Sequence, residues 1–232
     1  MWRKKSPLAA VRTSCRLLAI RSCSIKNQGS IRRLSFQNNR KKVGLYGGTF
    51  DPIHTVHLIV AEQARDILAL DEIWFLPARI PPHKQAKQIT ADVHRVKMIA
   101  HAIARHPSFR LDTIELEREP ELPSYTYDTV HILKERHPDI DFYFIIGGDM
   151  AAYLPKWHRI DELISMVQFV ALGRPGYVMD NPYMQCVIKV EMPQLDVSSS
   201  MIRKKVALGQ SIRYLVPEAV RMYIEEKRLY EA

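Results

Sequence analysis

The sequence predicts an α/β fold, a doubly wound parallel β-sheet with helices on both faces. Short apolar segments of strand length alternate with amphipathic segments of helix length from residue 41 to residue 229. Strands that are separated by helices pair in parallel, because each helix returns the chain across a face of the sheet. A chain of 232 residues with 47% apolar residues can also bury one sizeable core. We therefore expect one Rossmann-like domain at 41–232.

The first half of this domain alternates regularly between the two kinds of segment. KKVGLYGG is an apolar run that ends in two glycines, EIWFLPA is almost wholly apolar, and FRLDTIELE follows the second predicted helix, so these segments predict strands at 41–48, 72–78 and 109–117. Helical periodicity in HLIVAEQARDILAL and ADVHRVKMIAHAIARH predicts helices at 57–70 and 91–106.

The second half continues the pattern. Ser124 is a candidate cap for a helix with the sequence YTYDTVHILKERH at 125–137. DFYFIIGG, QFVALGR and CVIKVEM predict strands at 141–148, 168–174 and 186–192. RIDELISM, SSMIRKKVALG and PEAVRMYIEEKRL predict helices at 159–166, 199–209 and 217–229.

The positive charge of the chain lies in its N-terminal segment. Residues 1–42 contain twelve Lys and Arg and no Asp or Glu, so 22 basic and 25 acidic side chains remain in residues 43–232, which carry a net charge of −3. Because duplex binding normally needs a basic face, we expect no nucleic-acid partner for the folded part. No run approaches the ~18 apolar residues that a membrane span needs, so we expect no membrane association.

Residues 1–40 are rich in Arg and Ser, which fits more than one kind of segment. We interpret them as a basic, disordered N-terminal extension, or as upstream sequence that precedes the true start. An organellar transit peptide has the same composition. The expected location is cytoplasmic, with mitochondrial as the alternative if the extension is such a peptide.

Residues 47–57, GGTFDPIHTVH, follow the first predicted strand directly. In open α/β sheets, ligands bind beyond the carboxyl ends of the strands. Gly47 and Gly48 allow the backbone to turn sharply and to approach a phosphate. A helix that begins near residue 53 or 54 places His54 and His57 on one face of its first turn, where free N–H groups and the helix dipole favour anions. The motif predicts a polyphosphate site.

Each half of this motif has a simpler interpretation when it is taken alone. A Gly-Gly pair marks a turn, and two histidines mark a solvated helix start. A zinc site is a third interpretation, but histidines at i and i+3 without a nearby third ligand support it weakly. The combination of both features at the end of a strand favours phosphate binding.

Seven separated segments, in this order, resemble the nucleotidylyltransferase superfamily and, within it, the bacterial-type nicotinate-mononucleotide adenylyltransferases: GGTFDPIH, LPARIPPHK, PSYTYDT, FIIGGDM, LPKWHRIDEL, GRPGY and VSSSMIR. The resemblance extends from about Lys41 to the C-terminus. The superfamily motif is (H/T)-x-G-H, and this chain departs from it at Val56, which replaces the glycine. We expect this valine to weaken ATP binding without displacing the histidines.

The resemblance implies transfer of AMP from ATP to nicotinate mononucleotide, which forms nicotinate adenine dinucleotide and pyrophosphate in NAD biosynthesis. The acceptor is already a phosphate anion, so the catalyst's work is orientation and charge neutralisation. The implied catalytic residues are His57, which stabilises charge on the α-phosphate, His54 and Arg203. Arginine pairs with phosphate oxygens in a planar fork, although a serine-capped helix with an exposed arginine is the simpler interpretation of VSSSMIR.

The resemblance also implies the residues that contact each substrate. The expected ATP and phosphate contacts are Gly47, Gly48, Thr49, Phe50, Lys84, Ser199, Ser200 and Ile202, of which Lys84 reads equally well as a solvated loop lysine. The expected mononucleotide and ribose contacts are Thr126, Gly147, Asp149 and Trp157. Trp157 would stack on the pyridine ring, Thr126 and nearby N–H groups would bind the nicotinate carboxylate, and Asp149 would bind ribose hydroxyls.

The expected partners are therefore ATP and nicotinate mononucleotide, and self-association into a homo-oligomer is left open. No dedicated metal cage is predicted, and Mg²⁺ is expected to arrive with ATP, held by phosphates and water. Two other functions remain open: an adenylyltransferase for another phosphorylated acceptor, and a non-catalytic nucleotide sensor. Trp157 and the PSYT segment distinguish the first of these from nicotinate-mononucleotide adenylyltransferases.

Overall fold

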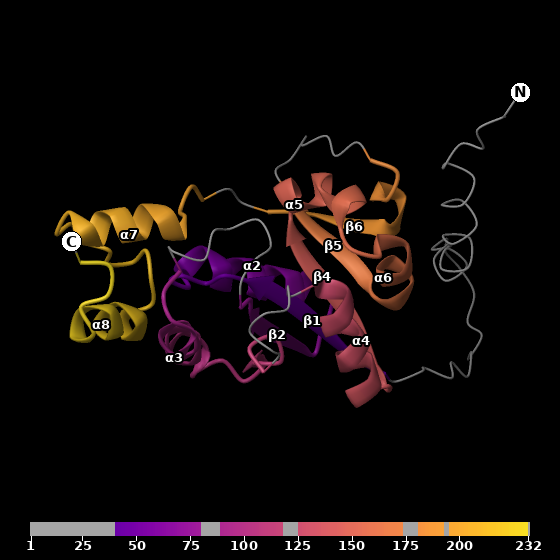
Figure 1. Ribbon diagram of the computed structural model, residues 1–232, viewed down its shortest axis with the longest axis horizontal. Helices are drawn as coiled ribbons and strands as arrows, with labels where there is room; N and C mark the ends of the chain where they lie inside the picture. Colours follow the sequence, from indigo (N-terminus) through magenta and orange to yellow (C-terminus); the bar gives the residue numbers. More distant parts are fainter. Residues whose placement is uncertain (1–39, 80–88, 118–124, 174–180, 193–194, 232) are drawn as a thin grey trace, which may run out of the picture.

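A single parallel sheet of six strands forms the centre of the protein (Figure 1). The computed structural model describes residues 40–79, 89–117, 125–173, 181–192 and 195–231. The strands are β1 (Lys41–Gly48), β2 (Glu72–Pro77), β3 (Phe109–Leu111), β4 (Ile140–Gly147), β5 (Gln168–Gly173) and β6 (Val187–Glu191). Their order in the sheet is β3-β2-β1-β4-β5-β6, and every neighbouring pair is parallel. The predicted doubly wound α/β fold is confirmed, and the winding direction switches between β1 and β4.

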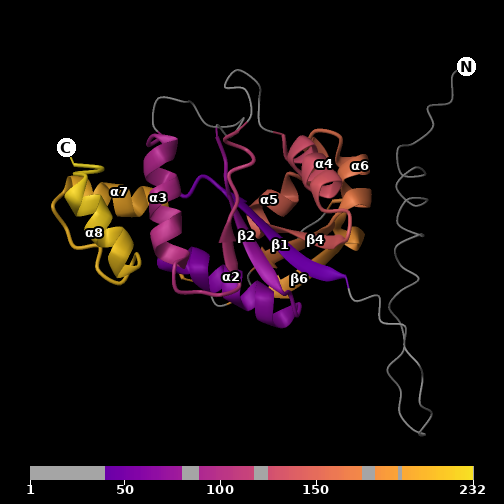
Figure 2. The same cartoon turned by 90° about the horizontal axis from the view of Figure 1, so that it is seen from below.

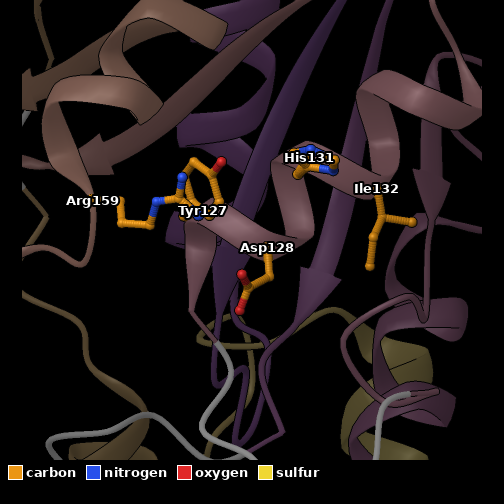
Figure 3. A pocket seen from close by; sticks show the side chains of 5 residues that line it. All are labelled: Tyr127, Asp128, His131, Ile132 and Arg159. Carbon is orange, nitrogen blue, oxygen red and sulfur yellow. The ribbon is translucent and has the colours of Figure 1, made fainter.

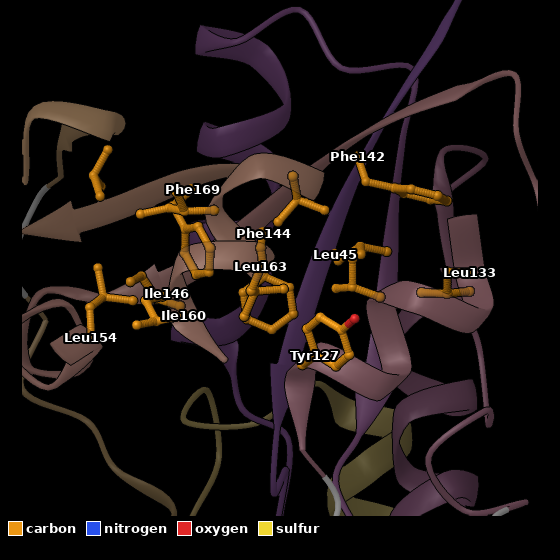
Figure 4. Close-up of a cluster of buried hydrophobic side chains, with 14 of the residues drawn as sticks. Leu45, Tyr127, Leu133, Phe142, Phe144, Ile146, Leu154, Ile160, Leu163 and Phe169 are labelled. Atoms are coloured by element: carbon orange, nitrogen blue, oxygen red, sulfur yellow. The ribbon is translucent and has the colours of Figure 1, made fainter. Parts of the chain in front are cut away.

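Helices cover both faces of the sheet (Figures 1 and 2). On one face, α4 (Thr126–Arg136), the short α5 (Gly148–Ala152) and α6 (Ile160–Met166) pack over a core that includes Leu45, Phe144 and Phe169 (Figure 4). On the other face, α2 (Thr55–Ile67) and α3 (Asp92–Ile103) pack over Ile73 and Ile145. Successive residues of a strand point to opposite faces, so one apolar run supplies both cores.

Gly44 shows how closely the elements pack on the second face. A Cβ atom at this position would lie 2.6 Å from Cδ1 of Ile73 and 3.0 Å from Cδ1 of both Ile145 and Leu70. A larger residue would therefore force the core of this face apart, because packed interiors have little free volume.

The C-terminal helices extend the second face at one end of the molecule. α7 (Ser199–Ala207) and α8 (Glu218–Glu226) lie beside α3 and far from α4 and α6 (Figures 1 and 2). Ile202 of α7 and both Val220 and Ile224 of α8 are buried in the same core as α2 and α3. This packing brings the C-terminal residues to the carboxyl end of β1. None of the helices in the described ranges has the length and apolar character to span a membrane.

The predicted and observed elements differ at one strand and one helix. The strand at 109–117 was predicted too long: β3 ends at Leu111, because the carboxylate of Asp112 accepts the N–H of Ile114 at 3.0 Å and starts a turn. The helix α5 was not predicted, because its five residues GDMAA are too few to show a period. The predicted cap Ser124 lies outside the described residues.

Two short 3₁₀ helices, at Leu154–Lys156 and Met184–Cys186, complete the described elements. Pro155 stands in the first turn of the former, where proline's fixed φ angle is compatible with a helix. This turn leads the chain from α5 to Trp157 and then to α6.

Candidate active site

The loop between β1 and α2 reverses direction over residues 47–54, which we call the phosphate loop. Phe50 has a φ angle of 49°, and its ring folds back over Gly48 into the core. A Cβ atom on Gly48 would lie 2.9 Å from Cζ of this ring, so glycine is required there. The peptide bond between Asp51 and Pro52 is cis. The reversal places His54 at the start of α2.

The two histidines of the motif are in direct contact. His54 is the N-cap residue of α2 and His57 is its third residue. The backbone N–H of His54 donates to Nδ1 of His57 at 3.1 Å, and the two rings stack with centroids 3.7 Å apart and planes at 26°. Because Nδ1 of neutral His57 is the acceptor, its proton resides on Nε2. His57 is thereby fixed as an Nε2–H donor.

Burial keeps both imidazoles neutral at physiological pH. It lowers the pKa of His54 to about 4, and this residue is only 5% exposed. Burial also lowers the pKa of His57 well below its usual value, and the neighbouring His54 lowers it further. Nδ1 of His54 is buried without a hydrogen-bond partner among the described residues. The pair therefore offers neutral hydrogen-bonding groups to a ligand, and positive charge has to come from elsewhere.

The N-terminus of α7 supplies that charge next to the phosphate loop. Ser198 caps α7 by accepting the N–H of Met201 at 3.2 Å. The hydroxyl of Ser199 donates to the carbonyl of Pro52 at 2.9 Å, and Nη1 of Arg203 donates to the carbonyl of Asp51 at 2.7 Å. These bonds join two segments about 150 residues apart. The predicted grouping of Arg203 with the histidine motif is therefore present in the structure.

Four predicted phosphate contacts occupy positions that restrict how they can meet a ligand. Phe50 and Ile202 bury their side chains in the core, so only their main chains could meet a ligand. The N–H of Ile202 donates to the carbonyl of Ser198 at 3.1 Å. The hydroxyl of Ser199 donates its proton to the carbonyl of Pro52 in the phosphate loop. Ser200 accepts from Nη2 of Arg203 at 3.4 Å.

The predicted mononucleotide residues lie at the ends of neighbouring elements. The half-buried Trp157 meets Phe144 and Phe169 edge to face, at ring-centroid distances of 5.9 and 5.7 Å. Gly47 also lies close to Phe144, because a Cβ atom added to this glycine would be 3.5 Å from Cζ of the ring. Trp157 is thus connected to the end of β1 through one aromatic ring.

For the remaining predicted residues, the structure gives the backbone position of three and does not describe the fourth. Thr126 is the first residue of α4, and Gly147 is the N-cap of α5. Asp149 lies in the first turn of α5, but its side chain is not among the described groups. Lys84 falls outside the described residues.

A shallow pocket of about 370 Å³ lies along α4 (Figure 3). Tyr127, Asp128, His131, Ile132 and Arg159 line it. The guanidinium of Arg159 lies 4.0 Å from the centre of the Tyr127 ring. None of the predicted site residues lines this pocket, so it does not coincide with the phosphate site.

The sequence analysis did not predict a role for two buried charged residues that support the phosphate loop. Arg95 of α3 is fully buried, and it donates to the carbonyls of Thr49 at 2.7 Å and Thr90 at 3.1 Å. Asp51 is 3% exposed and accepts the hydroxyl of Tyr230 at 2.7 Å. A signal existed for Arg95, because it shares the apolar face of α3 with Met98 at i+3. The sequence held no comparable signal for a bond between Asp51 and Tyr230.

A glycine-rich turn, two stacked imidazoles at a helix N-terminus and an arginine on a second helix are groups whose chemistry suits the phosphates of a nucleotide. The sequence comparison agrees with this chemistry: residues 45–205 match the cytidylyltransferase-like family. The chain belongs to this family of nucleotidyltransferases.

Within that family, the chain belongs to the nicotinate-nucleotide adenylyltransferases. It is 60% identical over 191 residues to a probable nicotinate-nucleotide adenylyltransferase of Geobacillus thermodenitrificans, covering 82% of this chain and 87% of the relative. It is 47% identical over 192 residues to the nicotinate-nucleotide adenylyltransferase of Bacillus subtilis, covering 83% of this chain and all of the relative.

A solved structure supports the fold. The Plasmodium falciparum nicotinic acid mononucleotide adenylyltransferase, complexed with NaAD, superimposes with a TM-score of 0.68 at 24% identity and covers 82% of this chain and 97% of its own. At this identity the similarity establishes the α/β architecture.

Proposed function

We propose that this protein transfers AMP from ATP to nicotinate mononucleotide, and that it forms nicotinate adenine dinucleotide and pyrophosphate in NAD biosynthesis. The observation that carries the proposal is the phosphate loop at the carboxyl end of β1, which leads to the stacked pair His54 and His57 and is bonded to Arg203 through the carbonyl of Asp51. The relatives at 47% and 60% identity carry the corresponding name, and the Plasmodium protein with this fold is complexed with NaAD.

In the proposed reaction, a phosphate oxygen of the mononucleotide attacks the α-phosphorus of ATP. The bond from the α-phosphorus to the bridging oxygen breaks, and pyrophosphate leaves with the electron pair. The attacking oxygen is already anionic, so no enzyme base has to remove a proton. Catalysis then rests on alignment of the two phosphates and on stabilisation of charge in the transition state.

The described side chains divide this work between neutral donors and one cation. His57 donates from Nε2 to an α-phosphate oxygen, since its Nδ1 is occupied by the backbone of His54. Arg203 contributes a permanent charge, because a guanidinium stays protonated at all relevant pH values. Its side chain is 31% exposed, so an incoming phosphate can reach it. A neutral His57 donates equally well across the physiological pH range.

Mg²⁺ fits this site as a companion of ATP. No three His, Cys, Asp or Glu side chains converge to hold a metal ion in the described ranges. The donors that line the phosphate loop suit phosphate oxygens, so phosphates and water would hold the ion. When bound, Mg²⁺ would neutralise charge on the phosphates.

The nicotinate subsite is proposed between Trp157 and the N-terminus of α4. The segment that follows Trp157 is held against this helix: His158 stacks on Tyr125 with ring centroids 4.4 Å apart, and Arg159 covers the ring of Tyr127. These contacts join the residues that follow Trp157 to the start of α4, which supports a subsite shared by the indole and the first N–H groups of this helix, beside Thr126. An aromatic platform next to a helix N-terminus suits a ring that carries a carboxylate.

Pyrophosphate release from ATP tests the proposal directly. We expect release with nicotinate mononucleotide and much slower release with nicotinamide mononucleotide or with other phosphorylated acceptors. Arg203→Ala should reduce the rate strongly. The matched control is Arg221→Ala, which removes an arginine that pairs with Glu218 and Glu225 on α8. ATP binding without release for any acceptor would favour a nucleotide sensor, and release with a different acceptor would replace the proposed substrate.

The N-terminal boundary, the location and the oligomeric state stay predictions. We propose that residues 1–40 are dispensable for the reaction, and that the enzyme acts in the cytoplasm. A transit-peptide role for these residues would place it in mitochondria instead. Self-association into a homo-oligomer is compatible with this function.

A further inference from the structure

We propose that Tyr230, which follows α8, is a positioning residue that aligns Arg203 for the nucleotide phosphates through the buried carboxylate of Asp51. This inference rests on the proposed function, because it assigns Tyr230 a role only through the phosphate contact of Arg203. None of the sequence motifs includes Tyr230. The argument begins with the environment of Asp51.

Asp51 is a carboxylate removed from water and held by three elements. Oδ1 accepts the hydroxyl of Tyr230 at 2.7 Å, and Oδ2 accepts the backbone N–H of Thr90 at 3.2 Å. Nη1 of Arg203 lies 4.0 Å from Oδ2. A buried carboxylate needs hydrogen bonds and a neighbouring positive charge to offset the loss of its hydration. Loss of the Tyr230 hydroxyl would leave Oδ1 without the donor that fixes its orientation.

Arg203 depends on Asp51 through both the main chain and the side chain. Its Nη1 donates to the carbonyl of Asp51 at 2.7 Å and also faces the carboxylate of the same residue. On the other side, Nη2 reaches Ser200 at 3.4 Å. The contacts with Asp51 therefore fix the position of Nη1 at one edge of the Arg203 guanidinium. The exposed part of the guanidinium can contact a ligand. Rotation of the Asp51 carboxylate would alter the charge that holds this edge.

Tyr230 is suited to remain a donor. Burial, followed by the nearby carboxylate of Asp51, raises the pKa of its phenol above the usual value, so the hydroxyl keeps its proton. The backbone around it is ordered by the N–H of Leu229, which donates to the carbonyl of Ile224 at 3.0 Å. Tyr230 also has a left-handed φ of 68°, which directs the chain back toward the phosphate loop after α8.

A second contact shows that the C-terminal segment supports the same loop. Thr55, the first residue of α2, donates its N–H to the carbonyl of Leu215 and its hydroxyl to the carbonyl of Tyr214, each at 2.9 Å. The start of α2 and Asp51 are thus both bonded to residues beyond α7. The segment after α7 is bonded to the first residue of α2 and, through Tyr230, to Asp51 in the phosphate loop, which is the partner of Arg203.

Tyr230→Phe removes one oxygen atom and keeps the ring, so it isolates the hydroxyl. We expect kcat/KM for ATP to fall about 10-fold, the scale of one hydrogen bond to a charged group, with an unchanged KM for nicotinate mononucleotide. The matched control is Tyr223→Phe on α8, whose hydroxyl lies 3.0 Å from Nδ1 of His94 and outside this network. The control should leave both constants unchanged.

A double-mutant cycle on the ATP dissociation constant separates positioning from general stability. If Tyr230 acts through Arg203, Tyr230→Phe should weaken ATP binding in the native background but change it less than about twofold in Arg203→Ala. Equal effects in both backgrounds, or no effect in either, would overturn the inference. If Tyr230→Phe proves unstable in a melting experiment, Asp51→Asn serves in the same cycle with the same expectation.

The cycle also separates this inference from the proposed function. A native enzyme that releases no pyrophosphate with any acceptor would refute the proposed function. A native enzyme that is active but shows additive effects of Tyr230→Phe and Arg203→Ala would refute only the role of Tyr230.

Discussion

Replacement of His57 should separate two tasks that one imidazole performs. In the structure, Nδ1 of His57 accepts the N–H of His54 and thereby caps α2, while Nε2 carries the proton offered to the α-phosphate. His57→Ala removes both. His57→Asn keeps an oxygen acceptor near the Nδ1 position and loses the distal donor. His57→Gln can place an N–H near the Nε2 position and loses the acceptor near the backbone.

The loss of the Nε2 donor and the loss of the cap can be distinguished, because the first lowers kcat and the second lowers stability. Deletion of one preorganised transition-state donor costs about 10²- to 10³-fold in kcat. Loss of a capping interaction costs about 1 kcal/mol of stability. His57→Ala should therefore show both effects, and His57→Asn should retain most of the stability but show the full loss of kcat. His57→Gln should show the stability loss with a smaller decrease in kcat.

The assay combines pyrophosphate release at saturating substrates with thermal unfolding of each variant. ATP affinity should change less than kcat in His57→Asn, because the donor acts mainly in the transition state. If His57→Asn keeps kcat within about threefold of the native value, the Nε2 donor has no catalytic role. If kcat and ATP affinity fall by the same factor, His57 is a binding residue only.

Four further predictions follow from the sequence and the site. Val56→Gly should lower the KM for ATP with little change in kcat, and should cost about 0.5 to 1 kcal/mol of stability because glycine is a poor helix former; an unchanged KM would show that the valine points away from ATP. Trp157→Ala should weaken nicotinate mononucleotide binding by about 1 to 3 kcal/mol in calorimetry while ATP affinity stays constant, and a shift mainly in ATP affinity would place the indole in the other subsite. His54 should contribute roughly 3 kcal/mol to a decrease in the free energy of unfolding as the pH falls from 6.5 to 4, because the unfolded chain binds a proton at the ordinary histidine pKa and folded His54 does so only near about 4; the lowered pKa of His57 acts in the same direction, so urea titrations at both pH values should show a decrease that His54→Gln reduces but does not abolish. Removal of residues 1–39 should leave kcat and the melting temperature unchanged, with Arg40 retained because it pairs with Asp141 at 3.0 Å, and an inactive or insoluble product would contradict it.

The sequence alone determined the fold class and the location of the phosphate loop. Apolar runs of strand length separated by amphipathic runs are local patterns, and they leave few topologies other than a parallel sheet with helices on both faces. The general rule that ligands bind at the carboxyl ends of such strands then placed His54 and His57 at the binding edge. Even the contact of the two imidazoles follows from their spacing at the start of a helix.

Tertiary packing decided which groups support that site and in what state. Arg203 reaches the carbonyl of Asp51, and Tyr230 reaches its carboxylate, across 152 and 179 positions of the chain. Such contacts depend on how α7 and α8 pack into the core shared with α2 and α3, and no periodicity or spacing in the sequence records that geometry. The neutrality of His54 likewise arises from burial, which depends on everything that surrounds the ring. The sequence thus determined the residues of the motif and their chemistry, whereas only the folded structure fixed their protonation and their distant partners, because desolvation and long-range contacts are properties of the packed molecule.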